Sequence, residues 1–408
     1  MNPRCSVDEV SGVLSRAVDS GAWTPDSKSA VFHDLDRMEA RIADLQQSFP
    51  PSTLHAIAIK ANPLVELLKL VVATGAGLEA ASWEEVQLAL AAGCPAERIV
   101  FDGPAKTEDE LTQSRALGLW LNVDHPDELR RLDALGAPAG AHIGLRVNPQ
   151  VGDGAIGFTS TVGKGSKFGV PLSEAPALVE QFPFISGLHV HTGSQGCGID
   201  LLQSAGLATA EMAAQLDLAW LDVGGGVPVR YTETDPEPPT YAAWANALSS
   251  MPGWPDRQLV TEIGRSLQAG CGWALSRIEA VKQTDGMPTL IVHLGADFLM
   301  RRVYRASEWD HEFVLLDPQG RPKSGPTSET RIAGPLCFAG DLLARHRPLP
   351  KAERGDLLWI RDCGAYTLSM WSRHCSRGLP PTWGYRSDAI TPLHRGERPE
   401  DVVDFWSL

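Results

Sequence analysis

A single lysine closes an apolar run near the start of the chain. Residues 55–60 read His-Ala-Ile-Ala-Ile-Lys, and a turn over residues 61–63 follows at once. This pattern predicts a buried strand that delivers Lys60 to its carboxyl end. A lysine held there loses hydration, so its neutral amine becomes accessible and suits the role of a Schiff-base nucleophile. Taken alone, the segment fits a surface lysine just past a strand better.

Polar groups follow other predicted strands in the same way. Arg146, His191 and Glu262 close later apolar runs, and three glycines, Gly224, Gly225 and Gly226, follow another. Glycines after a strand let backbone N–H groups approach an anion, and Arg265 on the neighbouring strand adds a bidentate contact suited to phosphate. The alternatives are that the three glycines only form a tight turn and that His191 is an ordinary core residue. The complete set predicts a site for pyridoxal 5'-phosphate (PLP).

Each residue of this set has its own predicted task. Glu262 would pair with the pyridine nitrogen and keep it protonated, which makes the ring an electron sink. His191 would stack on the face of the ring. Ser194 follows His191 closely enough to reach the phosphate, and Gly264 lies beside Arg265 in the predicted phosphate site.

The elements that must position these groups repeat as strand, turn and amphipathic helix. Eight such units favour an α/β fold with a parallel (β/α)₈ barrel, a TIM-like fold whose active groups lie at the carboxyl ends of the strands. A doubly wound open sheet is the alternative. The eight predicted strands are His55–Lys60, Leu78–Ala81, Arg98–Phe101, Leu119–Val123, His142–Val147, Ile185–His191, Leu218–Val223 and Gln258–Glu262.

The pattern changes after Gly264. Strand-like runs separated by turns dominate from there onward, and helical stretches are few. This predicts a second, mostly antiparallel β domain. We expect the barrel domain to cover residues 30–266, and the β domain to combine residues 1–29 with residues 267–408.

The composition excludes several classes of function. The chain has 408 residues and a net charge of −14, whereas binding to nucleic acid needs a clustered excess of cations. No apolar signal segment is found, and no apolar run approaches the ~18 residues that a membrane span needs. The seven cysteines are scattered and never form CxxC. This pattern indicates reduced thiols in a cytoplasmic protein without a metal site.

Taken in order, the motifs resemble those of the fold-type III PLP decarboxylases, most closely the diaminopimelate decarboxylase group, which is related to ornithine and arginine decarboxylases. Residues 58–62 match the A-x-K-A-N motif, residues 189–195 match H-x-H-x-G-S-Q, and residues 262–265 read E-I-G-R in place of E-P-G-R. Further along, residues 334–341 resemble G-P-x-C-E-S-G-D, and residues 364–366 match G-A-Y. The resemblance implies the two-domain fold that these decarboxylases share with alanine racemase.

The resemblance also implies roles for residues outside the strand-end set. The α-carboxylate of a small amino-acid substrate would leave as carbon dioxide, and Cys337 from the other subunit of a homodimer with shared active sites would protonate the carbanion. A thiol with a pKa near ~8.5 is mostly protonated at neutral pH and can donate. An inert buried cysteine is the alternative. Tyr366 would contact the phosphate, and Glu79 stands where ornithine decarboxylases have an aspartate. Lys60, His191 and Cys337 are thus the expected catalytic residues.

The chain departs from the family at the residues that would meet the substrate. Phe338 replaces the acidic residue that recognises a distal ammonium, and a phenyl ring cannot compensate a desolvated ammonium as a carboxylate does. The R-P-A-L-Y segment is one residue short, as Arg301-Arg302-Val303-Tyr304. Arg301, with Arg302 as a further candidate, would meet a carboxylate at the far end of the substrate, with Tyr304 and Asp341 nearby. A solvated face is the alternative for this cationic cluster.

We therefore expect a PLP-dependent decarboxylase for an amino acid with a carboxylated or conjugated side chain, of the kind found in natural-product or siderophore pathways. The alternatives are a meso-diaminopimelate decarboxylase of lysine biosynthesis, a racemase or aldolase on the same fold, and a non-catalytic homologue similar to antizyme inhibitors. The cysteine motif disfavours a racemase, and retention of Lys60, Glu262, Arg265 and Cys337 disfavours a non-catalytic protein.

Overall fold

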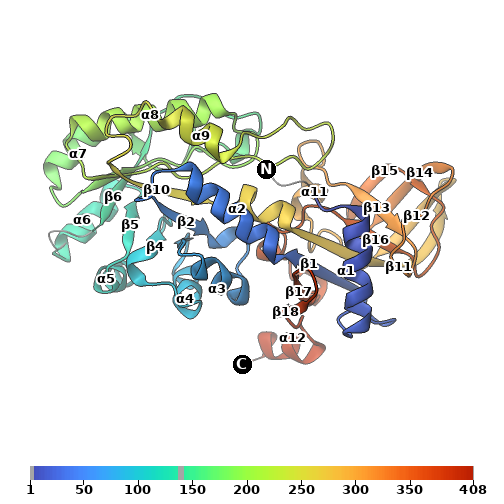
Figure 1. The fold of residues 1–408 in the computed structure, drawn as a ribbon. Coiled ribbons are helices and arrows are strands. Elements are labelled where there is room, and N and C mark those ends of the chain that lie inside the picture. The colour runs from blue at the N-terminus through green and yellow to red at the C-terminus, as the bar shows by residue number, and fades with distance from the viewer. Residues whose placement is uncertain (1–3, 137–141, 408) are drawn as a thin grey trace. The chain divides into compact units, whose positions relative to one another are not determined.

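The computed structural model describes residues 4–136 and 142–407, and the chain divides into two compact units (Figure 1). The first unit contains Glu39–Val229 and Pro236–Leu267. The second contains the described residues before Glu39, the short segment Arg230–Asp235 and the residues after Leu267. Residues 1–3, with which the expected β domain begins, lie outside the described ranges.

Parallel strands close into a barrel in the first unit. In the described residues the strand order is β2-β3-β4-β5-β6-β8-β9-β10, and β10 pairs with β2 to complete the circle. The predicted eight-stranded barrel is confirmed, and closure excludes the open sheet. The short strand β7 (Val170–Pro171) pairs beside β6. The barrel strands are β2 (Leu54–Ala58), β3 (Gly77–Ala80), β4 (Ile99–Phe101), β5 (Trp120–Val123), β6 (Ile143–Asn148), β8 (Gly187–His189), β9 (Trp220–Asp222) and β10 (Gln258–Ile263).

Helices connect the barrel strands and run along their outside (Figure 1). Their starts follow from local sequence. The Ser82 hydroxyl accepts a hydrogen bond from the Glu85 N–H, and Thr107 and Glu110 form a complete capping box. One helix stops at Gly118, whose φ of 74° is left-handed. The helices of this unit are α3 (Val65–Ala73), α4 (Trp83–Ala91), α5 (Glu108–Leu117), α6 (Pro126–Ala134), α7 (Ala175–Gln181), α8 (Ile199–Gln215) and α9 (Tyr241–Leu248).

The second unit is built on one mixed sheet with β11 at its centre. In the part of the chain that is described, β1–β17 and β12–β14 pair in parallel and the other neighbours are antiparallel. The predicted, mostly antiparallel β domain is therefore confirmed. Its strands are β1 (Ser29–Asp34), β11 (Gly272–Thr284), β12 (Met287–Val292), β13 (Phe313–Leu316), β14 (Thr327–Ala333), β15 (Leu342–Pro350), β16 (Leu357–Ile360), β17 (Thr382–Tyr385) and β18 (Ile390–His394).

Few helices accompany this sheet, as expected. Helix α2 is the one that carries the chain from the second unit into the first. None of the helices in the described ranges has the length and apolar character that a membrane span needs. The remaining helices are α1 (Val7–Asp19), α2 (Leu35–Ser48), α10 (Arg265–Gln268), α11 (Met300–Tyr304) and α12 (Pro399–Trp406).

Strand β1 lies in the second unit, although the expected boundary after residue 29 would have assigned most of it to the barrel. All six of its residues are buried, and the strand pairs with both β11 and β17. Phe32 stacks on Trp273 with ring centroids 4.4 Å apart. The second unit thus extends to residue 38, because its sheet needs β1 to bury this aromatic pair.

Candidate functional site

Lys60 lies two residues past the end of β2, in the short 3₁₀ turn Ile59–Ala61. Its Nζ is 2.5 Å from both carboxylate oxygens of Glu79, which is fully buried on the adjacent strand β3. Burial raises the pKa of Glu79 well above its usual value, although the charge of Lys60 opposes the shift. The barrel therefore holds an amine against a carboxyl group at the carboxyl ends of two neighbouring strands.

Glu262 on β10 forms the centre of a buried cluster with two histidines. Its Oε2 lies 3.1 Å from His191 Nδ1 and 3.4 Å from His189 Nε2. Burial opposes ionisation of Glu262, but the charge and hydrogen bond of His189 and the hydrogen bond of His191 outweigh it and hold the pKa of Glu262 well below its usual value. The pKa of His191 is lowered by burial, against the attraction of Glu262.

This cluster presents a carboxylate at the bottom of a polar site. One ligand atom from each of the three side chains lies within 4.8 Å of the others, a spacing that also suits a metal ion. A buried carboxylate held ionised is equally what a protonated ring nitrogen requires as its counter-charge. The choice between the two readings depends on the remaining groups of the site.

Arg146 belongs to a second buried group of charges. Its Nη1 lies 3.4 Å from Asp102, its Nε lies 3.8 Å from Asp124, and its guanidinium stacks on Phe168 at 4.4 Å. Burial and the charge of Glu262 would raise the pKa of Asp102, but Arg146 outweighs them together with Lys60 and His189, so the pKa is lowered. Arg146 thus keeps a carboxylate ionised beside the barrel mouth.

The glycine loop after β9 packs against the backbone of β10. Gly224 and Gly226 have φ values of 61° and 127°, and a Cβ at Gly225 would lie 2.1 Å from the Glu262 carbonyl oxygen. The Gly225 nitrogen lies 3.3 Å from His191 Nδ1, the atom that also faces Glu262. Only glycine fits this path, which brings backbone N–H groups next to the histidine–carboxylate cluster.

Arg265 joins this loop to the segment after β8. It follows Gly264 directly at the end of β10, is buried, and donates from Nε to Ser194 Oγ at 3.0 Å. A guanidinium, a hydroxyl and a glycine cradle at the carboxyl ends of β8, β9 and β10 form a donor set for phosphate. With Lys60 and Glu262 in the same barrel mouth, the residues present fit PLP better than a metal ion.

Phe338 lies in the loop between β14 and β15, and of the predicted residues of the second unit Tyr304 packs against it. Its ring stacks on Tyr304, with centroids 6.0 Å apart and planes 3° apart, and meets His374 edge-on at 6.0 Å. The adjacent Cys337 is exposed, and its backbone N–H donates to Cys375 Sγ at 3.4 Å. We call Tyr304, Phe338 and His374 the aromatic cluster.

The arginines near Tyr304 have different partners. The Arg301 guanidinium lies 4.8 Å from the Tyr366 ring and 5.0 Å from the Trp309 ring. Arg302 instead forms an ion pair with Asp310, with 2.8 Å between Nε and Oδ1. Of the predicted cationic cluster, Arg301 is the member that the structure brings together with Tyr366.

Asp341 is turned away from the aromatic cluster. Its carboxylate accepts hydrogen bonds from the N–H groups of Ala296 and Leu336, both at 2.7 Å, and the side chain is buried. A Cβ at Gly334 would lie 2.3 Å from the same carboxylate. The side chain therefore fixes the backbone that leads to Cys337.

Several residues of these groups were not predicted. His189, Asp102 and Asp222 lie in the barrel cluster, where Asp222 accepts from the Gly224 N–H at 2.8 Å. Their positions at or just beyond strand ends were a usable signal, because Asp102 follows β4 directly and Asp222 precedes the glycines. Cys375 had no such signal, since only the fold brings it to Cys337.

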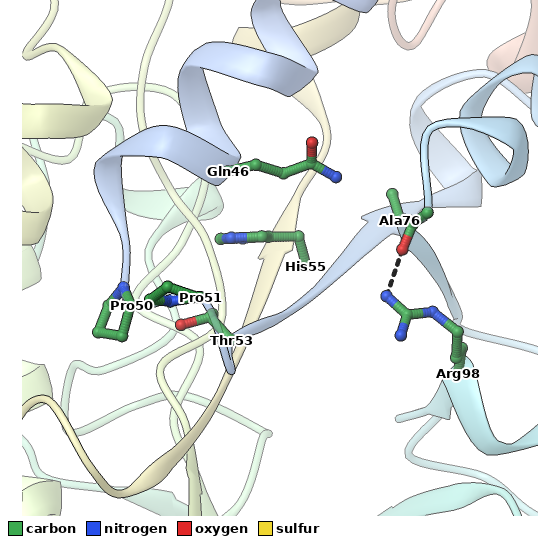
Figure 2. A pocket seen from close by; sticks show the side chains of 8 residues that line it. Gln46, Pro50, Pro51, Thr53, His55, Ala76 and Arg98 are labelled. Atoms are coloured by element: carbon green, nitrogen blue, oxygen red, sulfur yellow. Dashed lines mark hydrogen bonds between the residues drawn. The ribbon is translucent and has the colours of Figure 1, made fainter.

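A pocket with a volume of about 250 Å³ lies at the opposite end of β2 from Lys60 (Figure 2). His55 Nδ1 lies 2.8 Å from Thr261 Oγ1. Burial, reinforced by the charge of Arg98, lowers the pKa of His55 to about 4. The pocket is separate from the polar site at the barrel mouth. It is lined by Gln46, Pro50, Pro51, Thr53, His55, Gly75, Ala76 and Arg98.

Comparisons with known proteins agree with this chemistry. Residues 35–269 match the family model "Pyridoxal-dependent decarboxylase, pyridoxal binding domain". The diaminopimelate decarboxylase of Pseudomonas aeruginosa is 33% identical over 338 residues, which cover 80% of this chain and 79% of that protein. The diaminopimelate decarboxylase of Helicobacter pylori strain J99 is 31% identical over 391 residues, which cover 92% of this chain and 94% of that protein.

A solved structure extends the similarity to the fold. The crystal structure of diaminopimelate decarboxylase from Helicobacter pylori complexed with L-lysine superposes with a TM-score of 0.86 at 26% identity, covering 96% of this chain and 98% of that one. The matched family model covers more than half of the chain, including Lys60 and Glu262. The chain therefore belongs to the pyridoxal-dependent decarboxylases, and it is a carboxy-lyase that uses PLP to decarboxylate an amino acid.

Proposed function

We propose that this decarboxylase acts on an amino acid whose side chain ends without a free ammonium group. The observation that carries the proposal is the aromatic cluster, with Phe338 between Tyr304 and His374. A cation–π contact is worth about 0.5–2 kcal/mol. Desolvating an ammonium costs several kcal/mol even in a real protein. The cluster therefore favours a neutral or apolar group over a distal ammonium.

Asp341 does not replace the missing acid in this proposal. Its carboxylate is occupied by the N–H groups of Ala296 and Leu336. Turning it toward a substrate would leave two buried backbone donors unsatisfied, at a cost of about 1–3 kcal/mol each. We assign Asp341 to the support of the Cys337 loop, in place of the substrate contact expected from the sequence.

Arg301 is the group that we assign to a carboxylate at the far end of the substrate. Its central carbon lies over the Tyr366 and Trp309 rings at 4.8 and 5.0 Å, which is cation–π range. Carboxylate recognition uses the N–H edge, so the two contacts are compatible. We expect the two rings to restrict the guanidinium, which would reduce the entropy lost on binding.

In the barrel, Lys60 would hold PLP covalently, with the Glu79 carboxyl group 2.5 Å from its Nζ. Glu262 would pair with the ring nitrogen, and His191 would pack on the ring. The phosphate would be held by Ser194, Gly264, Arg265 and the glycines 224–226, with Tyr366 as a further expected contact and Arg146 fixing the charges beside it. When bound, PLP supplies the electron sink that stabilises the negative charge left at Cα.

Cys337 donates the proton that completes the reaction. We propose that the thiol comes from the second subunit of a homodimer and transfers its proton from Sγ to Cα of the decarboxylated substrate. Its exposure agrees with a role at a shared site. General acids of this kind contribute roughly 10²–10⁴-fold to the rate.

A second candidate is decarboxylation of meso-diaminopimelate. It is supported by the similarity to the diaminopimelate decarboxylases of Pseudomonas aeruginosa and Helicobacter pylori. Under this alternative a distal ammonium would have to be bound beside Phe338 without the acidic residue that the family uses there.

The two candidates are separated by carbon dioxide release from the PLP-loaded protein. The panel contains meso-diaminopimelate, lysine, ornithine, arginine, glutamate and amino acids with carboxylated or acylated side chains. We expect the highest kcat/KM for a substrate without a distal ammonium, and a loss for Arg301→Ala confined to substrates with a distal carboxylate. A maximum at meso-diaminopimelate would establish the second candidate instead.

A further inference from the structure

Two of the cysteines differ from the others in exposure. Among the described residues, Cys337 and Cys375 are exposed, and the other five cysteines are buried. These two also touch, because the backbone N–H of Cys337 donates to Cys375 Sγ at 3.4 Å across 38 residues of sequence. The solvent-accessible thiols of the described chain therefore form a pair.

The thiol of Cys375 is held in place by an unusual backbone. Cys375 and Ser376 have φ values of 58° and 53°, in the left-handed region that residues other than glycine rarely adopt. Two contacts clamp the segment: Trp371 Nε1 donates to the Arg377 carbonyl at 3.0 Å, and Arg377 pairs with Asp297 at 2.8 Å. Strain of this kind, about 1–3 kcal/mol per residue, persists where the surroundings enforce it and is concentrated at functional positions.

The separation is short enough for a covalent bond. The Cα of Cys337 lies about 1.46 Å from its nitrogen, so it is within about 5 Å of Cys375 Sγ. A disulfide needs the two sulfur atoms about 2.0 Å apart. The Cys337 side chain is exposed, so we expect it to turn about χ1 toward Cys375 Sγ.

We propose that Cys337 and Cys375 form a reversible disulfide under oxidising conditions and thereby remove the proton donor of the decarboxylase. The consequence for activity rests on the proposed function, in which Cys337 is the acid. The oxidant is a small disulfide such as oxidised glutathione. One cysteine thiolate attacks it and releases one glutathione thiol. The second cysteine attacks the mixed disulfide and releases the other, so two cysteine protons end on two glutathione thiols.

The chemical test uses the full-length holoprotein exposed to oxidised glutathione, alkylated and digested for mass spectrometry. We expect one linked peptide pair that contains residues 337 and 375, and its disappearance on reduction. Cys375→Ser and Cys375→Asn should both lose the link, and asparagine tolerates left-handed backbone, so the second variant keeps the fold. A stable glutathione adduct on Cys337 in the wild-type protein, without the link, would overturn the proposal.

Activity separates this inference from the role of Cys337 itself. Decarboxylation of the best panel substrate should fall in proportion to the linked fraction, by roughly 10²-fold when linkage is complete, and return with dithiothreitol. Unoxidised Cys375→Ser should match the wild type. If Cys337→Ser keeps full activity while the wild type still forms the link, the acid assignment fails and the disulfide stands. If no link forms, the disulfide fails whatever Cys337→Ser does.

Discussion

His191 and Glu262 share a hydrogen bond of 3.1 Å across 71 residues of sequence, inside the mouth of the barrel. The bond ties the segment after β8 to the last barrel strand, and His189 approaches the same carboxylate oxygen at 3.4 Å. The histidines keep Glu262 ionised in a buried position, as its assignment as counter-charge to the cofactor ring nitrogen requires.

Glu262→Gln tests this counter-charge. A neutral amide cannot stabilise a protonated ring nitrogen, so we expect kcat to fall by roughly 10²-fold or more, the scale for removing a preorganised charge, while PLP remains bound. The measurement combines the visible absorption of the purified protein with carbon dioxide release. Glu84→Gln, an exposed change in the first turn of α4, is the control and should leave both unchanged. Unaltered turnover in Glu262→Gln would contradict the assignment.

Gly225→Ala tests the phosphate cradle. The added methyl group would lie 2.1 Å from the Glu262 carbonyl oxygen, so the loop must shift. We expect PLP affinity to fall at least about tenfold, since a hydrogen bond to a charged group is worth roughly 1.5–3 kcal/mol. Equilibrium titration with PLP measures the effect. Gly198→Ala, with open space around its Cβ position, is the matched control; equal affinities in the two variants would count against the cradle.

Phe338→Glu tests the specificity of the aromatic cluster. Restoring a carboxylate beside Tyr304 and His374 should raise kcat/KM for meso-diaminopimelate relative to the native substrate by about tenfold or more, the range of 1.5–3 kcal/mol for a charged hydrogen bond. Phe338→Gln removes the ring without adding charge and should give no such gain. The idea fails if both variants respond alike in the substrate panel.

Mixing two inactive variants tests the shared site. Lys60→Ala and Cys337→Ser are each expected to lose activity, and subunit exchange should restore about one quarter of the wild-type sites if each site joins the two chains of a symmetric dimer. Light scattering checks the dimer, and carbon dioxide release checks the recovery. Continued inactivity in a mixture whose subunits demonstrably exchange would place both residues of a site in one chain.

The His55 side chain gives the first unit a pH-dependent stability. Its folded pKa of about 4 lies below the ordinary 6.5, so between these values only the unfolded chain binds the proton. The free energy of unfolding therefore falls as the pH drops from 6.5 toward 4, by about 1.4 kcal/mol per unit. Urea unfolding measures the free energy of unfolding at pH 7 and at pH 5. The difference between these two values should be roughly 2 kcal/mol smaller in His55→Gln than in the wild type.

Thr261→Val is the matched control for this measurement. It removes the partner of His55 Nδ1 while keeping the imidazole buried. Both variants lose the same hydrogen bond, so both should be less stable than the wild type at pH 7. The pH slope should persist in Thr261→Val and shrink in His55→Gln, and equal slopes would rule out His55 as the titrating group.

Much of the barrel could be predicted because its signals are local. Ser82 and Thr107 are N-cap residues and indicate where helices begin. Short apolar runs locate all eight barrel strands. Strand β15 has no clear apolar signature, because charged side chains such as Arg345 interrupt its pattern. Strand β1 is fully buried, and its pattern cannot indicate which sheet it joins.

The residues of the site likewise divide into those with a local sequence signal and those that only the fold brings together. Lys60 and Glu262 were found from the sequence because each ends an apolar run, and barrel topology then brings such ends together. Asp222 was overlooked although it ends a strand just before the glycines. Cys375 acquires its importance only through space, from Cys337, and no pattern in the neighbouring sequence distinguishes it from an ordinary turn residue.

The pairing of β1 with β11 has a consequence for synthesis on the ribosome. His33 pairs with Gly272, so about 240 residues must be translated before the partner strand exists. At about 5–20 residues per second this takes roughly 10–50 s. The barrel can form during that interval, but the apolar surface of β1 has no sheet to join. Strand β1 therefore stays unpaired after its synthesis, and the rate of translation sets how long it needs protection by chaperones.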